Sequence, residues 1–542
     1  MKFIFPFLLV GSLLISCGKK TTVDLILLDA KIYTVDSTFR QEEAIAIKGG
    51  EIIAIGDNAY ISNHYTAPLI SSMSGKTILP GWIDAHCHFY GLGLMRQRVD
   101  LTSAGSFNEV LNRLIKFQKE NNHSYLLGEG WDQNLWNDKT FPNKTSLDSL
   151  FPTTPVAIRR IDGHALLVNQ AALSLANITT ETVFKGGSIE QKGGELTGII
   201  IDKPMQLIFN SQPPPSRSIQ IKALKEAENI CFSHGLTSVT DAGLDHDIIQ
   251  LIDSLQKAGE LKIRINAMIN FNQDNLAHYI KKPPYTSNLL QVNSFKVYAD
   301  GSLGSRGACL KEHYSDKKGH HGHLLSSIEE LEAMIQTISN SPYQLNSHAI
   351  GDSTNKVMLS LYQKHLKNKP NRRWRIEHAQ VLDPSDYPLF SNGIIPSVQP
   401  THAISDMLWA KDRLGEDRIS TAYAYSDLLA INGIIALGTD FPIEKVDPRL
   451  TFHAAVSRQN TQQEPEMGFQ TQHALSREQT LRGMTIWAAF ASFEEQKKGS
   501  LEVGKLADFI VLDQDIMKIE KSKIPTIQIE QTYLDGELVF KN

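Results

Sequence analysis

The sequence contains little cysteine and has no strong excess of charge. Its 542 residues include four cysteines, and Cys87, Cys231 and Cys309 show no spacing typical of a metal or redox motif. A disulfide scaffold is therefore not expected. The formal net charge is −5, and basic residues form only short clusters such as Lys281-Lys282. This composition gives no support for a nucleic-acid-binding surface, so we expect no nucleic-acid partner.

The N-terminal apolar run is too short to span a membrane. It extends from Phe3 to Ile15, whereas a spanning helix needs roughly 20 residues, and it has the length of a signal-peptide core. It ends in Leu14–Gly18, a segment that resembles the bacterial lipobox. We expect residues 1–16 to be a lipoprotein signal peptide and Cys17 to be lipidated, so that the exported protein is held on a membrane of the cell envelope. An ordinary cleaved signal with a chance cysteine is the alternative.

Both ends of the mature chain contain short, β-branched strand patterns separated by turn residues. Residues 17–76 include Val23–Leu28 and Ala44–Ile47, and residues 491–542 include Ala507–Leu512 and Thr532–Val539. Because chain termini often lie close together, we expect the two groups to complete one small β-sandwich.

Between these ends, apolar strand candidates alternate with helical patterns, which is typical of βα units and a parallel sheet. Residues 77–490 are therefore predicted to form an α/β fold, a TIM (β/α)8 barrel. The gap after the first strand is far longer than a crossover of about a dozen residues, so an inserted subdomain is expected at about residues 103–225. The eight strand candidates are Thr77–Asp84, Ser238–Asp241, Ile263–Ile269, Phe295–Ala299, Tyr343–Ser347, Trp374–Glu377, Ile394–Gln399 and Ile434–Gly438.

Histidines and an aspartate occur where several of these strands end. On a strand, His86 and His88 point to the same face about 6.6 Å apart, so both can bind one ion. His348, His378 and Asp440 each follow another strand candidate. Catalytic groups of a TIM barrel gather at the C-terminal ends of its strands, so these five residues predict a metal centre.

Several motifs resemble the amidohydrolase superfamily, and more narrowly amidohydrolase family 3, which includes N-substituted formamide deformylases. The resemblance implies that His86, His88, His348, His378 and Asp440 are metal ligands, with Asp440 also exchanging protons with the nucleophilic water. It further implies that Lys296 is carboxylated and bridges two ions. An unmodified lysine paired with a neighbouring acid such as Asp300 is the alternative. The motifs are Pro80–His88, Glu129–Asp132, Asp162–His164, Lys296–Arg306, Ser347–Asp352, Ile376–Ala379, Gly438–Pro442 and Gly504–Phe509.

The expected function is hydrolysis of C–N bonds in small amides or formamides by a metal-activated water, with Asp440 as the general base. Zinc is the first choice of metal, as one or two ions. The substrate-binding candidates are Asp162, His164 and Arg306. The alternatives are a deaminase, lactonase or isomerase on the same fold, and an exported metal-binding lipoprotein without turnover. The sequence leaves a homodimer open.

Overall fold

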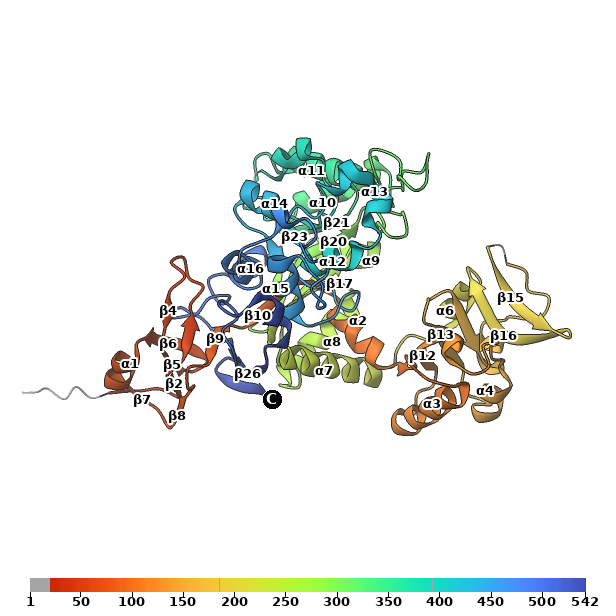
Figure 1. The fold of residues 1–542 in the computed structure, drawn as a ribbon, viewed down its shortest axis with the longest axis horizontal. Helices are drawn as coiled ribbons and strands as arrows, with labels where there is room; N and C mark the ends of the chain where they lie inside the picture. Colours follow the sequence, from red (N-terminus) through yellow and green to blue (C-terminus); the bar gives the residue numbers. More distant parts are fainter. Residues whose placement is uncertain (1–19, 185, 370, 392) are drawn as a thin grey trace, which may run out of the picture. The chain divides into compact units, whose positions relative to one another are not determined.

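The computed structural model describes residues 20–184, 186–369, 371–391 and 393–542. The described chain forms two compact units (Figure 1). One combines the residues up to His88 with Asn229–Asn542, and the other comprises Phe89–Glu228, a range that contains the predicted insertion. Each unit is described by itself below.

The first unit contains a nearly closed parallel barrel, as the alternating pattern predicts. Its strands follow one another around the barrel in chain order, and all neighbours pair in parallel. The strands are β10 (Trp82–Cys87), β17 (Leu236–Leu244), β18 (Arg264–Asn270), β20 (Leu290–Tyr298), β21 (Gln344–Ala349), β22 (Arg375–His378), β23 (Ile395–Val398) and β24 (Ala436–Leu437).

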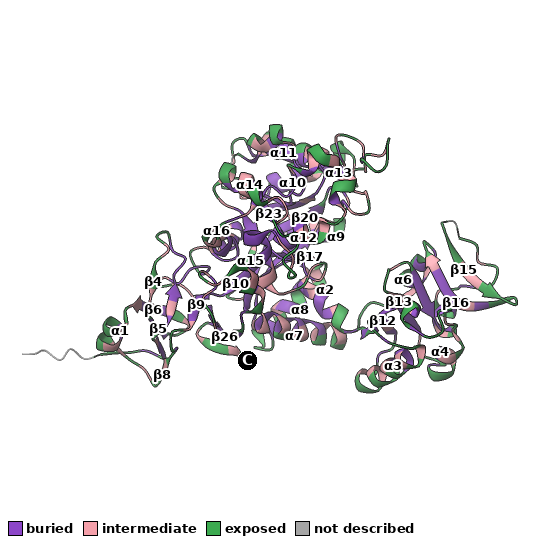
Figure 2. Ribbon diagram, viewed as in Figure 1, coloured by how far each residue is buried: buried purple, intermediate pink, exposed green. Residues whose placement is uncertain are grey.

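The barrel strands are buried almost throughout (Figure 2), which explains their continuous apolar runs. The helices between them present one apolar face; α8, for example, buries Ile249, Ile252 and Leu255. These helices are α7 (Arg217–Ser233), α8 (His246–Lys257), α9 (Gln273–Tyr279), α10 (Ile328–Ser339), α11 (Asp352–Leu366), α12 (Pro400–Asp406), α13 (Ala410–Ile419), α14 (Tyr425–Asn432), α15 (Pro448–Ser457), α16 (Arg477–Gly483) and α17 (Ile486–Ala491).

The strand predicted at Thr77–Asp84 is two strands, so that prediction was wrong in its first half. β9 (Thr77–Pro80) pairs with β25 (Phe509–Leu512) in a terminal sheet, and only β10 enters the barrel. Gly81 separates them, and a Cβ there would lie 2.3 Å from the Thr237 hydroxyl oxygen. Close packing against β17 thus allows only glycine where the chain changes sheets.

The two chain ends form the predicted β-sandwich. One sheet has the order β6-β5-β2-β8 and the other the order β27-β26-β25-β9-β3-β4. A shared apolar core that includes Leu27, Ile45, Phe509 and Val511 joins the N-terminal and C-terminal segments. The remaining bounds are β2 (Leu25–Leu28), β3 (Lys31–Tyr33), β4 (Gln41–Glu42), β5 (Ala44–Lys48), β6 (Glu51–Gly56), β8 (Leu69–Ser72), β26 (Ile529–Leu534) and β27 (Glu537–Lys541).

The second unit has its own mixed sheet with the order β11-β12-β13-β14-β16-β15. Its core includes Trp131 and Trp136, whose rings stack with centroids 6.0 Å apart. The elements are α2 (Phe89–Arg96), β11 (Val99–Asp100), α3 (Phe107–Asn121), β12 (Leu126–Trp131), α4 (Thr145–Leu150), β13 (Val156–Arg160), β14 (Ala165–Val168), α5 (Gln170–Leu175), β15 (Gly187–Lys192), β16 (Glu195–Asp202) and α6 (Met205–Ser211).

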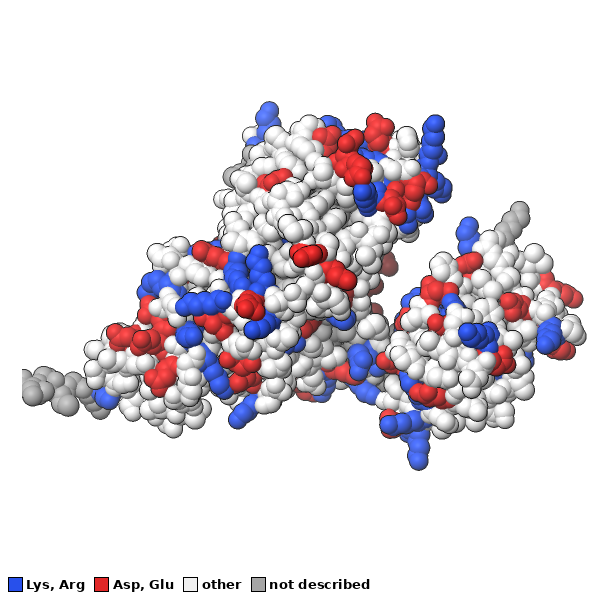
Figure 3. All heavy atoms as spheres, viewed as in Figure 1, with Lys and Arg blue, Asp and Glu red and all other residues white. Residues whose placement is uncertain are grey.

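Acidic and basic side chains are interspersed on the face shown in Figure 3. Within the described ranges, no helix combines the length and apolar character needed to cross a membrane. The predicted signal peptide and Cys17 lie outside the described residues.

Candidate metal centre

The carboxyl ends of five barrel strands bring the predicted site residues together. His86 lies on β10 and His88 directly after it, while Lys296, His348 and His378 lie on β20, β21 and β22. Asp440 follows β24 by three residues. All six side chains line one cavity of about 530 Å³. The six predicted metal-site residues therefore lie together in the structure.

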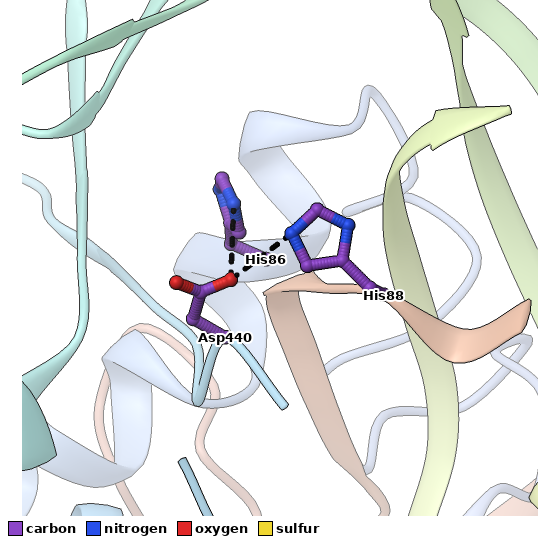
Figure 4. Close-up of side chains that lie close together, drawn as sticks. All are labelled: His86, His88 and Asp440. Carbon is purple, nitrogen blue, oxygen red and sulfur yellow. Dashed lines mark ion pairs between the residues drawn. The ribbon is translucent and has the colours of Figure 1, made fainter. Parts of the chain in front are cut away.

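One carboxylate oxygen of Asp440 lies near both His86 and His88 (Figure 4). Its Oδ1 is 3.2 Å from His88 Nε2 and 3.6 Å from His86 Nε2. The Asp440 backbone N–H donates to the His86 carbonyl at 2.7 Å, and the His88 N–H donates to the Phe441 carbonyl at 2.7 Å. These bonds join the last barrel strand to the first and fix the three candidate ligands relative to one another.

Asp84 anchors the loop that carries Asp440. It accepts hydrogen bonds from the Thr439 hydroxyl at 2.7 Å and from the Thr439 and His86 backbone N–H groups at 3.0 and 3.1 Å. Gly438 lies so close that a Cβ would be 2.5 Å from the His86 nitrogen. Glycine is therefore required at position 438 by the close approach of this segment to β10.

Two candidate ligands have strained backbones. His378 has φ 74° and Asp440 has φ 62°, both in the left-handed region that non-glycine residues rarely adopt. Such conformations cluster at functional sites, where the surrounding structure holds them in place.

A buried ion pair orients His86. Glu377 Oε2 accepts a hydrogen bond from His86 Nδ1, and Arg375 Nε lies 2.7 Å from Glu377 Oε1. Burial opposes the charge of Glu377, but Arg375 and His86 lower the pKa of Glu377 well below its usual range. His86 Nδ1 is thus the donor, which leaves the Nε2 lone pair directed at the cavity. A carboxylate behind a histidine in this way is typical of metal sites.

His378 and His348 also have nitrogens available for a ligand. His378 Nδ1 lies 2.8 Å from Gln399 Oε1, so Nε2 carries the free lone pair. His348 Nε2 and Asp440 Oδ1 are buried and have no hydrogen-bond partner among the described residues. Burial and Lys296 lower the pKa of His86 to about 4 and that of His348 to about 3, so both rings are neutral at pH 7.

These donors fit a divalent metal ion. Neutral imidazole nitrogens with a carboxylate oxygen are the ligand set of zinc and related ions. Within the described residues, the ligand atoms of His86, His88 and Asp440 lie within 4.8 Å of one another, as do those of His378, His402 and Asp440. A bound cation would supply a partner for the buried atoms of His348 and Asp440.

Lys296 reaches the same centre from the fourth barrel strand. Its Nζ lies 3.4 Å from His86 Nε2, and its side chain is buried. Burial lowers the pKa of Lys296 to about 8, which raises the fraction of neutral amine at neutral pH.

His402 is a site residue that the sequence prediction missed. It lies on α12, after β23, with Nε2 3.2 Å from Asp440 Oδ2 and Nδ1 3.1 Å from Glu444 Oε1. Burial opposes its charge, but Asp440 and Glu444 raise the pKa of His402 to about 10. His402 lies three residues past the seventh predicted strand, on a helix, where the strand pattern no longer marks it.

Arg306, one of the predicted substrate-binding residues, is not in this cluster. Arg306 pairs with Asp316 through bonds of 3.0 and 2.8 Å and does not line the cavity. Asp162 and His164 belong to the second unit, where the exposed His164 ring contacts Asp202 at 2.8 Å. Their roles stay predictions.

The barrel and its histidine cluster define a metal-dependent hydrolase. The chain belongs to the amidohydrolase family, whose model matches residues 73–540. It is 30% identical to a putative amidohydrolase, YtcJ, of Bacillus subtilis (strain 168), over 94% of this chain and 98% of that protein. It is also 23% identical to an N-substituted formamide deformylase of Arthrobacter pascens, over 96% and 98% of the two chains.

A solved structure extends the similarity to the fold. An uncharacterized metal-dependent hydrolase of Pyrococcus horikoshii OT3 matches with a TM-score of 0.78 and 28% identity, covering 92% of this chain and 99% of that one. The predicted family and fold class are therefore confirmed.

Proposed function

We propose that this hydrolase cleaves the C–N bond of small amides, including N-substituted formamides. The observation that carries the proposal is the convergence of ligand atoms from His86, His348, His378 and Asp440 on one cavity. Two of these atoms, His348 Nε2 and Asp440 Oδ1, have no hydrogen-bond partner among the described residues. The name of the Arthrobacter pascens relative supports an amide-type bond.

His86, His88, His348, His378 and Asp440 would hold the divalent ion, with zinc the first choice. When bound, the ion would polarise the scissile carbonyl and lower the pKa of the attacking water.

Asp440 acts as the proton carrier. Its Oδ1 accepts no hydrogen bond and borders the cavity, so it can take a proton from the attacking water. The same oxygen can later return that proton to the departing amine nitrogen. Burial opposes its charge, but His402 and His88 keep the pKa of Asp440 well below its usual range, so the carboxylate is ionised when water arrives.

His402 is the positioning residue for this carboxylate. It donates from Nε2 to Asp440 Oδ2 and from Nδ1 to Glu444, so that Oδ1 alone faces the water. His402→Gln is expected to lower kcat by roughly 10- to 100-fold, at the low end of what a proton-transfer group contributes, with KM nearly unchanged. A shifted pH profile of kcat at unchanged metal content would distinguish positioning from a structural role. Loss of the metal in His402→Gln would contradict the positioning role of His402.

Lys296 is proposed to be carboxylated and to bridge two ions. Its neutral amine would attack CO2, form the N–C bond and release one proton. Nuclear magnetic resonance of protein equilibrated with isotope-labelled bicarbonate should show a carbamate signal that Lys296→Gln lacks. The same signal in both proteins, or none in either, would refute the carbamate.

The activity is tested on the soluble form without residues 1–17. A panel of N-formyl and N-acyl amines is assayed for amine release before and after chelation, with lactones and amino-substituted heterocycles in parallel. Amine release that stops on chelation and returns with zinc supports the proposal. Turnover confined to lactones or to deamination would move the function to the alternative chemistries.

We further propose that the protein is exported and anchored through a lipid on Cys17. The lipobox-like Leu14–Gly18 supports this location. Cells fed a labelled fatty acid should label the wild type but not Cys17→Ser, and the variant should leave the membrane fraction. Equal membrane association of both proteins would contradict lipid anchoring.

A further inference from the structure

Two carboxylates line the cavity in addition to Asp440. Asp406 is the last residue of α12, and Glu444 follows β24 by seven residues. Both border the same cavity as the candidate metal ligands. The chemistry proposed above assigns neither of them a contact with substrate.

Asp406 is held through only one of its oxygens. Oδ2 accepts hydrogen bonds from Gln380 Nε2 at 2.8 Å and from the Tyr423 hydroxyl at 2.9 Å. Among the described residues, no hydrogen bond reaches Oδ1. The carboxylate is thus fixed in orientation with one oxygen available to a ligand.

Glu444 has the same arrangement. Its Oε1 lies 3.1 Å from His402 Nδ1 and accepts from the Ser405 hydroxyl at 2.5 Å, whereas no described residue bonds to Oε2. The two carboxylates also influence each other. Burial raises the pKa of Asp406, His402 lowers it, and Glu444 raises it again, to about 6.

Apart from His402, which already pairs with Glu444 and Asp440, the cavity wall offers little basic charge to balance these carboxylates. Of the described residues that line it, none is an arginine and Lys296 is the one lysine. Lys296 is 1% exposed and stands beside His86, at the metal centre. The remaining wall is largely apolar and includes Leu303, Ile350 and Trp409. A ligand therefore meets an apolar surface with two uncommitted carboxylate oxygens.

We infer that the cavity selects cationic amides, in which the amine portion carries a second, protonated amino group. The inference rests on the proposed amide hydrolysis. The ammonium group donates to Asp406 Oδ1 and Glu444 Oε2, and its methylene chain lies along the apolar wall. Amides that carry a carboxylate are excluded, because their charge would be desolvated beside like charges.

The test compares three formamides of similar length. They are N-formylcadaverine, which is cationic, N-formylhexylamine, which is neutral, and N-formyl-ε-aminocaproate, which is anionic. The metal-loaded protein is assayed at about pH 8, where Asp406 is ionised because its pKa is about 6. We expect kcat/KM to fall about tenfold from the cationic to the neutral compound, as for a hydrogen bond between charged groups, and further for the anionic one.

Asp406→Asn tests the contribution of the Asp406 negative charge to this preference. The asparagine carbonyl can still accept from Gln380 and Tyr423, so only the uncommitted oxygen is replaced. The preference for the cationic over the neutral compound, taken as the ratio of their kcat/KM values, should fall about tenfold. Glu416→Gln, at a side chain that is 77% exposed on α13, is the matched control and should leave the ranking unchanged.

Failure of the inference differs from failure of the proposed function. Turnover of all three compounds with equal or anionic preference would overturn the inference and leave amide hydrolysis intact. If none of the three compounds is hydrolysed, the preference for the cationic compound is tested by measuring the binding of the same compounds by calorimetry. Tighter binding of the cationic compound, weakened by Asp406→Asn, supports the inference, and equal binding of the cationic and neutral compounds refutes it.

Discussion

The barrel contains two buried clusters of charged and polar side chains that differ in whether their atoms are paired. Arg264 opens strand β18 at its amino end, where its Nε and Nη2 lie 2.6 and 3.0 Å from the two Asp508 oxygens. Its Nη1 donates to the Asn288 carbonyl at 2.9 Å. At the carboxyl ends of the strands, His348 Nε2 and Asp440 Oδ1 are equally buried but lack hydrogen bonds.

The difference separates stability from function. A buried polar atom without a partner lowers the free energy of unfolding by roughly 1–3 kcal/mol. The paired atoms of the Arg264 cluster avoid this loss, whereas the unpaired atoms of the histidine cluster incur it in the metal-free protein. A bound cation supplies the missing partners at the second cluster. Substitutions in the Arg264 cluster should therefore lower the free energy of unfolding, whereas substitutions in the histidine cluster should lower the activity.

The largest effect is expected for Asp440→Asn, which removes the carboxylate while keeping its shape. Loss of the proton carrier should lower kcat/KM by about 10³-fold or more, or about 4 kcal/mol. The metal-free variant should still unfold cooperatively near the wild-type temperature, measured by circular dichroism. Asp412→Asn, at an exposed position on α13, is the control and should retain activity. An Asp440→Asn protein with wild-type turnover would remove Asp440 from the mechanism.

Arg264→Met tests the other cluster. It leaves the buried Asp508 carboxylate without its partner, which should lower the free energy of unfolding by about 3 kcal/mol or more. Urea denaturation measures this change, and metal content per folded molecule should stay constant. Arg306→Met breaks a more exposed pair with Asp316 and should cost less than about 1 kcal/mol. Equal costs for the two variants would show that the Arg264 cluster has no special structural role.

The buried His86 should make the stability of the metal-free protein depend on pH. In the metal-free protein, burial and Lys296 lower the pKa of His86 to about 4, whereas an unfolded histidine titrates near about 6.5. Between these values the unfolded chain binds a proton that the folded chain does not, so stability is full above about pH 6.5 and declines toward about pH 4.

For His86 this decline is worth up to about 3 kcal/mol. Urea denaturation of the metal-free protein across this range measures it, and His86→Gln should reduce the slope. Identical slopes in both proteins would contradict a neutral, buried His86.

Most of the barrel and of the ligand cluster was predictable, because each ligand follows an apolar strand directly in the sequence. His402 was not found because it lies on helix α12, four residues past Val398, where no strand periodicity marks it. Asp406 and Glu444 were missed for the same reason, since helix and loop positions carry no signal of which side chains turn toward a cavity. The split at Gly81 depends on its contact with Thr237, which is distant in sequence.

The pairing of the chain ends was expected, but its register was not. Leu79 belongs to a segment that the sequence assigned to the first barrel strand, so its antiparallel pairing with Ile510 could be read only from the structure. Packing of Phe509 and Val511 on the shared core selects that register.

The central claim is that the histidine cluster binds a catalytic metal. The most direct measurement is the metal content of the purified form without residues 1–17, compared with His348→Asn and with His246→Asn, a histidine outside the cluster. The account predicts one or two divalent ions per chain in the wild type and in His246→Asn, with a clear loss in His348→Asn. A wild-type protein that binds no metal after supply of zinc, iron or manganese, or a His348→Asn variant with unchanged metal content, would contradict it.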